Sequence, residues 1–159
     1  MSEYNAKVVW NRKPDEAFID NKYSRGHRWE FDGGAIIAAS SAPSIVPLPY
    51  SIEANVDPEE AFVASISSCH MLFFLGISGK KRLVIDQYID NPIGVMSKDA
   101  DGKISMTRVT LRPQVTFSGK QPSAEILQKM HHQSHQQCFI ANSVKAEIVT
   151  EIVNPEMAL

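Results

Sequence analysis

The sequence predicts an α+β fold in which a mainly antiparallel sheet packs with two main helices. Short stretches with period-two alternation of apolar residues surround two longer segments in which apolar residues recur at helical spacing. No regular alternation of strands and helices, which would predict a parallel α/β fold, runs through the chain. At 159 residues with 43% hydrophobic content, the chain is long enough to bury one core, so we expect a single domain over residues 1–159.

The first part of the chain is predicted to form strands. Residues 3–10 and 22–39 contain β-branched and aromatic residues, and Asp32-Gly33-Gly34 predicts a turn within the second stretch. Residues 41–50 contain three prolines, which lack the backbone N–H that a sheet requires. We therefore expect a surface loop there.

A long helix is predicted to begin at Asp57. Asp57 can cap the helix, Pro58 suits its first turn, and Glu60 completes a capping-box pattern. The helix is expected to end at Gly79. Its apolar residues recur at helical spacing, at Phe62, Ile66, Cys69, Phe73 and Ile77. This spacing predicts that Cys69 lies on an apolar face.

The same helix contains an uncharged run long enough to suggest a membrane span, because residues 61–79 lack Asp, Glu, Lys and Arg. Its serines, its histidine and its two glycines make it a poor hydrocarbon segment. We interpret it instead as a helix buried on nearly all sides, at the centre of a domain or an oligomer.

The second half of the chain is predicted to form a hairpin, a helix and a last strand. Two strand-like stretches within residues 83–118 flank a turn at residues 99–102. Pro122 and Ser123 begin a second amphipathic helix, and residues 144–153 alternate as a closing strand.

Charge and composition exclude some functions. The formal net charge is -2 and no block of lysine or arginine occurs, so nucleic-acid binding is disfavoured. The polar start MSEYNAKVVW lacks an apolar signal-peptide core, which predicts a cytoplasmic location. Because cytoplasmic thiols are kept reduced, a bond between Cys69 and Cys138 would be transient, catalytic or sensory.

The two cysteines suggest thiol chemistry, since a thiolate can attack a peroxide and a second cysteine can then close a disulfide. The alternative is that both are small buried hydrophobes. An attacking thiolate needs a cation, for which Arg25 and Arg28 are candidates. Glu59 and Glu60 could orient that arginine, or could merely cap the helix.

Helix geometry constrains where such a site can form. Glu59 and Cys69 are ten residues apart, which is about 15 Å along a helix, so they cannot share a site within one helix. Two copies crossing antiparallel near Ala64 would place Glu59 of one chain level with Cys69 of the other. The small residues of this helix would allow this close approach, namely Ala61, Ala64, Ser65 and Ser68. We therefore hypothesise a homodimer with two sites at its interface.

Three segments carry a resemblance to a known family. YSRGHRWEFDGG near the start, DPEEAFVASISSCHMLFFL around Cys69 and CFIANSVKAEI around Cys138 resemble the OsmC/Ohr family of thiol-dependent peroxidases. The resemblance implies an intertwined homodimer with two central helices packed against sheets. It implies reduction of organic hydroperoxides without a metal or bound organic cofactor. Phe139 stands where the Ohr branch usually has proline, which favours the OsmC-like branch.

The resemblance also implies roles for individual residues. Cys69 resembles the peroxidatic cysteine, Cys138 the resolving cysteine, Arg25 the activating arginine and Glu59 its carboxylate partner. Arg28 lies three residues from Arg25 and stays an alternative. The cycle implied is attack of Cys69 on a hydroperoxide, a sulfenic acid, a disulfide with Cys138, and reduction by an external dithiol, a lipoyl protein or a thioredoxin-like protein.

Histidines on the second helix suggest a competing function. His131 and His135 share a helix face and Cys138 follows, which is a spacing that could bind zinc. The alternative is a solvated, glutamine-rich face. His70 follows Cys69 directly, but adjacent helical residues point about 100° apart, which disfavours a Cys-His dyad. A non-catalytic binding module is the third class. Phe62, Phe73 and Phe74 are expected either to line a substrate pocket or to form core.

Overall fold

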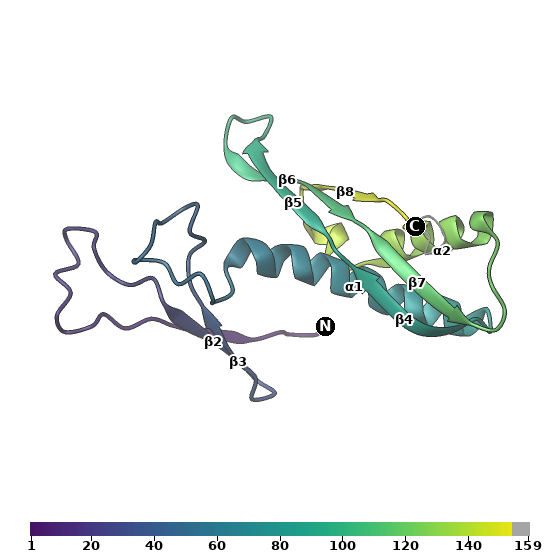
Figure 1. The fold of residues 1–159 in the computed structure, drawn as a ribbon, viewed down its shortest axis with the longest axis horizontal. Coiled ribbons are helices and arrows are strands. Elements are labelled where there is room, and N and C mark those ends of the chain that lie inside the picture. Colours follow the sequence, from purple (N-terminus) through teal and green to yellow (C-terminus); the bar gives the residue numbers. More distant parts are fainter. Residues whose placement is uncertain (154–159) are drawn as a thin grey trace. The chain divides into compact units, whose positions relative to one another are not determined.

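The computed structural model describes residues 1–153 (Figure 1). The chain divides into two compact units, one formed by Met1–Ala61 and one that begins at Phe62. The helices and strands confirm the predicted α+β class with a mainly antiparallel sheet arrangement. A single domain over residues 1–159 stays a prediction.

The first unit contains a three-stranded antiparallel sheet in the order β1-β2-β3. Trp29 lies at its centre, opposite Val8 on one side and Ile37 on the other. The turn after β2 uses Gly34 with φ of 89°, a backbone conformation that glycine adopts without steric cost. Residues 41–50 contain no strand, as predicted from their prolines. The strands are β1 (Ala6–Val9), β2 (His27–Phe31) and β3 (Ile36–Ala39).

Helix α1 (Pro58–Lys80) begins with the predicted capping box. The Glu60 backbone N–H donates to Asp57 Oδ1 at 2.8 Å, and the Asp57 N–H donates to Glu60 Oε2 at 3.2 Å. The buried face differs from the predicted one. It is formed by Ile66, His70, Phe74, Ile77 and Ser78, and Cys69 is half-buried beside it. By length and composition alone α1 could span a membrane. Only these five of its 23 residues are buried within the chain, so the helix is not buried on nearly all sides here.

The predicted hairpin forms around the turn at residues 99–102 but breaks into four strands. β4 (Val84–Asp90) pairs with β7 (Pro113–Ser118), and β5 (Ile93–Lys98) pairs with β6 (Ile104–Leu111). Pro92 lies in one break, where a ladder donor is missing. At the same level Asp90 accepts hydrogen bonds from the Arg112 N–H at 2.6 Å and from Ser67 Oγ at 2.5 Å, which ties the break to α1.

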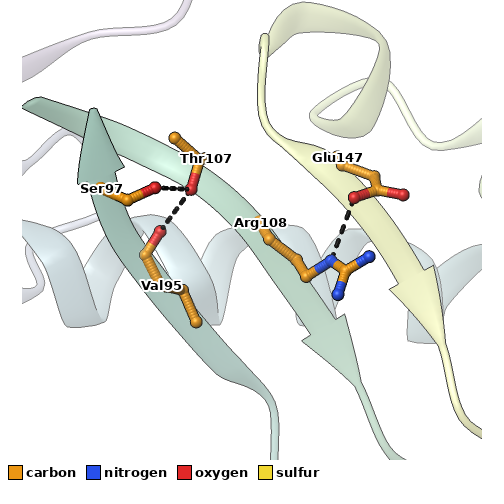
Figure 2. A network of polar contacts seen from close by, with 5 residues as sticks. All are labelled: Val95, Ser97, Thr107, Arg108 and Glu147. Atoms are coloured by element: carbon orange, nitrogen blue, oxygen red, sulfur yellow. Dashed lines mark hydrogen bonds and ion pairs between the residues drawn. The ribbon is translucent and has the colours of Figure 1, made fainter. Parts of the chain in front are cut away.

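The closing strand is shorter than predicted and adds a parallel pairing. β8 (Glu147–Thr150) pairs with β6, which extends the β5-β6 pair into a three-stranded sheet. Polar side chains link its strands (Figure 2). Ser97 on β5 lies 2.6 Å from Thr107 on β6, and Arg108 Nε donates to Glu147 on β8 at 3.0 Å. These half-exposed contacts fix cross-strand register more than they add stability.

Helix α2 (Ala124–Gln137) begins at the predicted N-cap, where Ser123 accepts the Ile126 N–H. Its Met130 joins a core cluster with Phe74 and Ile77 of α1 and with residues of the β4-β7 pair. A second cluster joins Ile66 to the β5-β6-β8 sheet. Both cysteine-bearing segments are therefore anchored in the core of the second unit.

Candidate active site

Arg25 lies in the loop before β2, and its guanidinium is held by its own loop. Nη1 donates to the carbonyl oxygens of Asn21 at 2.9 Å and Tyr23 at 2.5 Å, and Nη2 donates to Asn21 Oδ1 at 2.9 Å. The Arg25 Cζ lies 3.7 Å from the centroid of the Tyr23 ring, which adds a cation–π contact. Asn21 adopts φ of 65°, a left-handed conformation that asparagine tolerates. The direction of the guanidinium is therefore fixed before any ligand arrives.

Arg25 and Glu59 line one cavity of about 500 Å³ within the first unit. Much of its wall is aromatic. Phe18 stacks on Tyr23 with ring centroids 4.5 Å apart, and Trp10 meets both rings at 5.9 and 5.6 Å. Arg25 and Glu59 form no ion pair with each other, and the other polar residues of the lining are His27, Ser40 and Ser41. The structure thus brings together two of the four predicted site residues.

The capping geometry distinguishes Glu59 from Glu60. Glu60 exchanges hydrogen bonds with Asp57 at the start of α1, so its carboxylate is occupied. Glu59, one residue earlier, turns to the cavity. The capping alternative therefore applies to Glu60, and Glu59 is the acid near Arg25.

Arg28 is engaged elsewhere. On β2 its Nε donates to Glu30 at 2.6 Å, and Lys7 on β1 contacts the same carboxylate at 3.3 Å. The hydrogen bonds from Arg28 and then Lys7 lower the pKa of Glu30. Arg28 is absent from the wall that Arg25 and Glu59 share. Of the two candidate arginines, Arg25 is therefore the one that lines the cavity with Glu59.

His27 is a residue of this cavity that sequence reasoning missed. Trp29 Nε1 donates to its Nε2 at 3.1 Å, so the ring hydrogen lies on Nδ1, which donates to the Arg25 carbonyl oxygen at 2.8 Å. His27 thus holds the Arg25 backbone. The cavity residues Trp10, Phe18 and Tyr23 were also missed, although three aromatic residues in a polar segment could have indicated a binding surface.

The two cysteines are neighbours in the second unit. Cys138, the C-cap residue of α2, is 0% exposed, and its sulfur accepts the Ala141 N–H at 3.3 Å and lies 4.0 Å from Ile66 O on α1. Burial, together with the nearby Cys69 thiol, raises the pKa of Cys138 to about 11. Both thiols are free. The structure therefore pairs a half-buried sulfur with a fully buried one that stays protonated near neutral pH.

The phenylalanines that were candidates for a pocket lining form packing contacts within the second unit. Phe74 is fully buried and packs on His131 at a centroid distance of 4.2 Å. Phe62 packs against the second core cluster, and Phe73 meets Phe139 edge to face at 5.0 Å. These rings belong to the packing around α1.

The predicted zinc ligands do not converge. Within residues 1–153, no three His, Cys, Asp or Glu side chains lie close enough to hold one metal ion. His131 turns into the core, where its Nδ1 lies 3.0 Å from Nε2 of His70. His70 therefore faces α2, and it forms no dyad with Cys69.

The chain is similar in sequence and in fold to known proteins. A family model described as OsmC-like protein matches residues 53–153. A solved OsmC-like protein of unknown function from Vibrio cholerae is 59% identical, with a TM-score of 0.95 over 96% of this chain and 100% of that chain. An organic hydroperoxide resistance protein from Elizabethkingia anophelis is 13% identical, with a TM-score of 0.69 over 97% of this chain and 96% of that chain.

A third solved structure is the organic hydroperoxide resistance protein OhrB of Bacillus subtilis. It is 17% identical, with a TM-score of 0.61 over 95% of this chain and 98% of that chain. At such identities this protein and the one from Elizabethkingia anophelis share the fold alone. No curated protein matches the chain.

Proposed function

Because this chain belongs to the OsmC-like family, we propose that it is a cysteine-based peroxidase that reduces organic hydroperoxides. The observation that carries the proposal is the sulfur pair. Cys69 is half-buried, whereas Cys138 is fully buried, close by and protonated near neutral pH. A peroxidatic cysteine must meet its substrate, and a resolving cysteine must meet only the first sulfur. The two environments match these two roles.

The proposed reaction begins with attack of the Cys69 thiolate on the distal oxygen of the hydroperoxide. The O–O bond breaks, the alkoxide takes a proton and leaves as an alcohol, and Cys69 becomes a sulfenic acid. Cys138 then attacks the Cys69 sulfur, and water leaves with the sulfenic oxygen. The disulfide that remains is reduced by an external dithiol through thiol–disulfide exchange.

We assign Arg25 and Glu59 to the binding of the peroxide group. The guanidinium can donate hydrogen bonds to both peroxide oxygens, and the Glu59 carboxylate can orient it. The aromatic wall formed by Trp10, Phe18 and Tyr23 suits the apolar part of an alkyl or aryl hydroperoxide. Hydrogen peroxide has no such part, so we expect it to be the poorer substrate.

We further propose that the active form is a homodimer in which Arg25 and Glu59 of one chain serve Cys69 of the other. The separation of Glu59 from Cys69 along α1 motivates this arrangement. The exposed face of α1 supports it, because Leu72 is 62% exposed and small residues lie on the same side. These small residues are Ala64, Ser65 and Ser68.

The proposed cycle needs no bound cofactor. Electrons come from a dithiol, a lipoyl protein or a thioredoxin-like protein, and the cycle suits the reducing cytoplasm. Such donors can reduce an accessible disulfide by thiol–disulfide exchange.

The test is turnover of cumene hydroperoxide, tert-butyl hydroperoxide and hydrogen peroxide with several dithiols, together with mass spectrometry of the product. We expect faster turnover of the two organic substrates and a Cys69–Cys138 bond after one equivalent of peroxide. Cys138→Ser is the matched control, in which the sulfenic acid should persist and react with dimedone. The proposal would be overturned if no donor supported peroxide consumption, or if both thiols stayed reduced after peroxide was added.

A further inference from the structure

A pair of histidines joins the two helices that carry the cysteines. His70 on α1 and His131 on α2 are 61 positions apart, and Nε2 of the first lies 3.0 Å from Nδ1 of the second. The rings are nearly parallel, with an interplanar angle of 12°. Within residues 1–153, this is the one hydrogen bond between side chains of α1 and α2.

The pair is buried and uncharged. His70 is 1% exposed and His131 is 2% exposed, and Phe74 stacks on the His131 ring. Burial lowers the pKa of His70 to about 4 and that of His131 to about 3, so both rings are neutral near pH 7. One ring therefore donates its single N–H to the other.

The pair is not an efficient source of stability. His70 Nδ1 and His131 Nε2 have no hydrogen-bond partner within the described residues. A buried polar atom without a partner is unfavourable, so two apolar side chains of similar volume would stabilise this contact better. A hydrogen bond, unlike apolar packing, fixes a direction and a register between the two helices.

The register matters because the sulfurs lie on the same two segments. His70 follows Cys69 directly, and His131 precedes Cys138 by seven positions, about two helical turns. A further polar contact between these segments is that of Cys138 Sγ with Ile66 O, at 4.0 Å, and the Cys138 thiol also lies within hydrogen-bond reach of the Cys69 thiol. The histidine pair thus holds α1 and α2 in register on one side of the point where the sulfurs meet.

We propose that His70 and His131 are positioning residues whose hydrogen bond brings Cys69 and Cys138 into reach for disulfide formation. The role concerns the second step of the cycle, in which water leaves and the S–S bond forms, and so it rests on the proposed function. The histidines touch neither the peroxide nor the leaving oxygen. They set the effective concentration of one sulfur at the other.

Two substitutions of His131 separate the hydrogen bond from the packing. His131→Phe keeps an aromatic ring against Phe74 and loses the hydrogen bond. His131→Asn loses the ring but keeps a polar atom near the position of Nδ1. The measurement is the equilibrium of the Cys69–Cys138 disulfide against a glutathione redox couple, without peroxide, so it does not require peroxidase activity.

We expect His131→Phe to lower the equilibrium constant for disulfide formation by about tenfold, a rise of about 30 mV in the reduction potential. His131→Asn should stay within about threefold of the wild-type constant. In peroxide experiments, His131→Phe should form the sulfenic acid at the wild-type rate and close the disulfide more slowly. His70→Leu, which removes the same hydrogen bond from the other helix, should behave like His131→Phe and decides the matter if His131→Phe does not fold.

A merely structural pair would give a different result. It would destabilise the reduced and oxidised proteins equally and leave the disulfide equilibrium unchanged, and that outcome would overturn the inference. A protein that forms the disulfide with glutathione and responds to His131→Phe, yet consumes no hydroperoxide, would overturn the proposed function and leave the inference in place.

Discussion

The Arg25 cavity and the sulfur pair are held in place in opposite ways. Contacts within the loop fix Arg25, since Asn21 and Tyr23 are at most four positions away. Contacts across 61 and 72 positions, those of His70 with His131 and of Ile66 with Cys138, hold the segments of the sulfur pair. Changes in the loop should therefore alter activity without altering stability, whereas changes to the long-range contacts that hold the sulfur-bearing segments should alter both. Each prediction below tests this contrast.

The largest effect is expected from Cys69→Ser. Loss of the nucleophile should lower peroxide turnover by at least about a thousandfold with every reductant. Serine is close to cysteine in size and Cys69 is half-buried, so the melting temperature should stay near the wild-type value. Peroxide consumption and thermal unfolding measure the two quantities. Full activity in this variant would show that the roles of the cysteines are wrongly assigned.

Arg25→Met should lower turnover by about a hundredfold, the effect typical of losing one aligned donor to a reacting oxygen. Arg28→Met, three positions further on in β2, is the matched control. Because Arg28 pairs with Glu30, its loss should change turnover by less than about twofold. Steady-state rates with cumene hydroperoxide distinguish the two. An equal loss of turnover in the two variants would mean that Arg25 has no special role in peroxide binding.

Acid should destabilise the histidine pair. Its folded-state pKa values lie below the unfolded value of 6.5, so the stability is present above pH 6.5 and is lost as the pH falls toward about 4. Between pH 7 and pH 5 each histidine should remove about 2 kcal/mol from the free energy of unfolding. His131→Phe should therefore lose about 2 kcal/mol less than the wild type over this interval. Urea unfolding at both pH values measures it, and an identical pH dependence would contradict the neutral buried pair.

The smallest effects separate two adjacent acids. Glu60→Ala should lower the free energy of unfolding by about 1 kcal/mol, because it removes half of the capping box. Glu59→Ala should leave stability unchanged and lower turnover by about tenfold. Urea unfolding and steady-state kinetics on the two variants provide the comparison. A reversed pattern would place Glu60, rather than Glu59, beside the substrate.

Local signals in the sequence predicted much of the fold. The start of α1 followed from Asp57, Pro58 and Glu60, because a capping box is formed by residues three positions apart. The turns and the start of α2 followed from glycine, proline and serine, because these residues act on the backbone within a few positions of themselves. The two early stretches of strand were also right in position, with the turn at Gly34.

Contacts between distant residues could not be predicted. Nothing in the spacing of His70 and His131 indicates that the two rings are in contact. The parallel pairing of β8 with β6 likewise depends on the tertiary fold and not on the local sequence of either strand. One choice was readable in retrospect. Arg28 and Glu30 are two positions apart in a strand and so share a face, which leaves Arg25 as the one of the two candidates without a carboxylate partner among the described residues.

The complete burial of the Cys138 sulfur has a practical consequence. A bulky maleimide added to the native protein should alkylate Cys69 alone, and the second cysteine should react only after the chain is unfolded in urea. One label before unfolding and two afterwards would give a direct footprint of the native core. Fluorophores could thus be attached at one chosen position without engineering the chain.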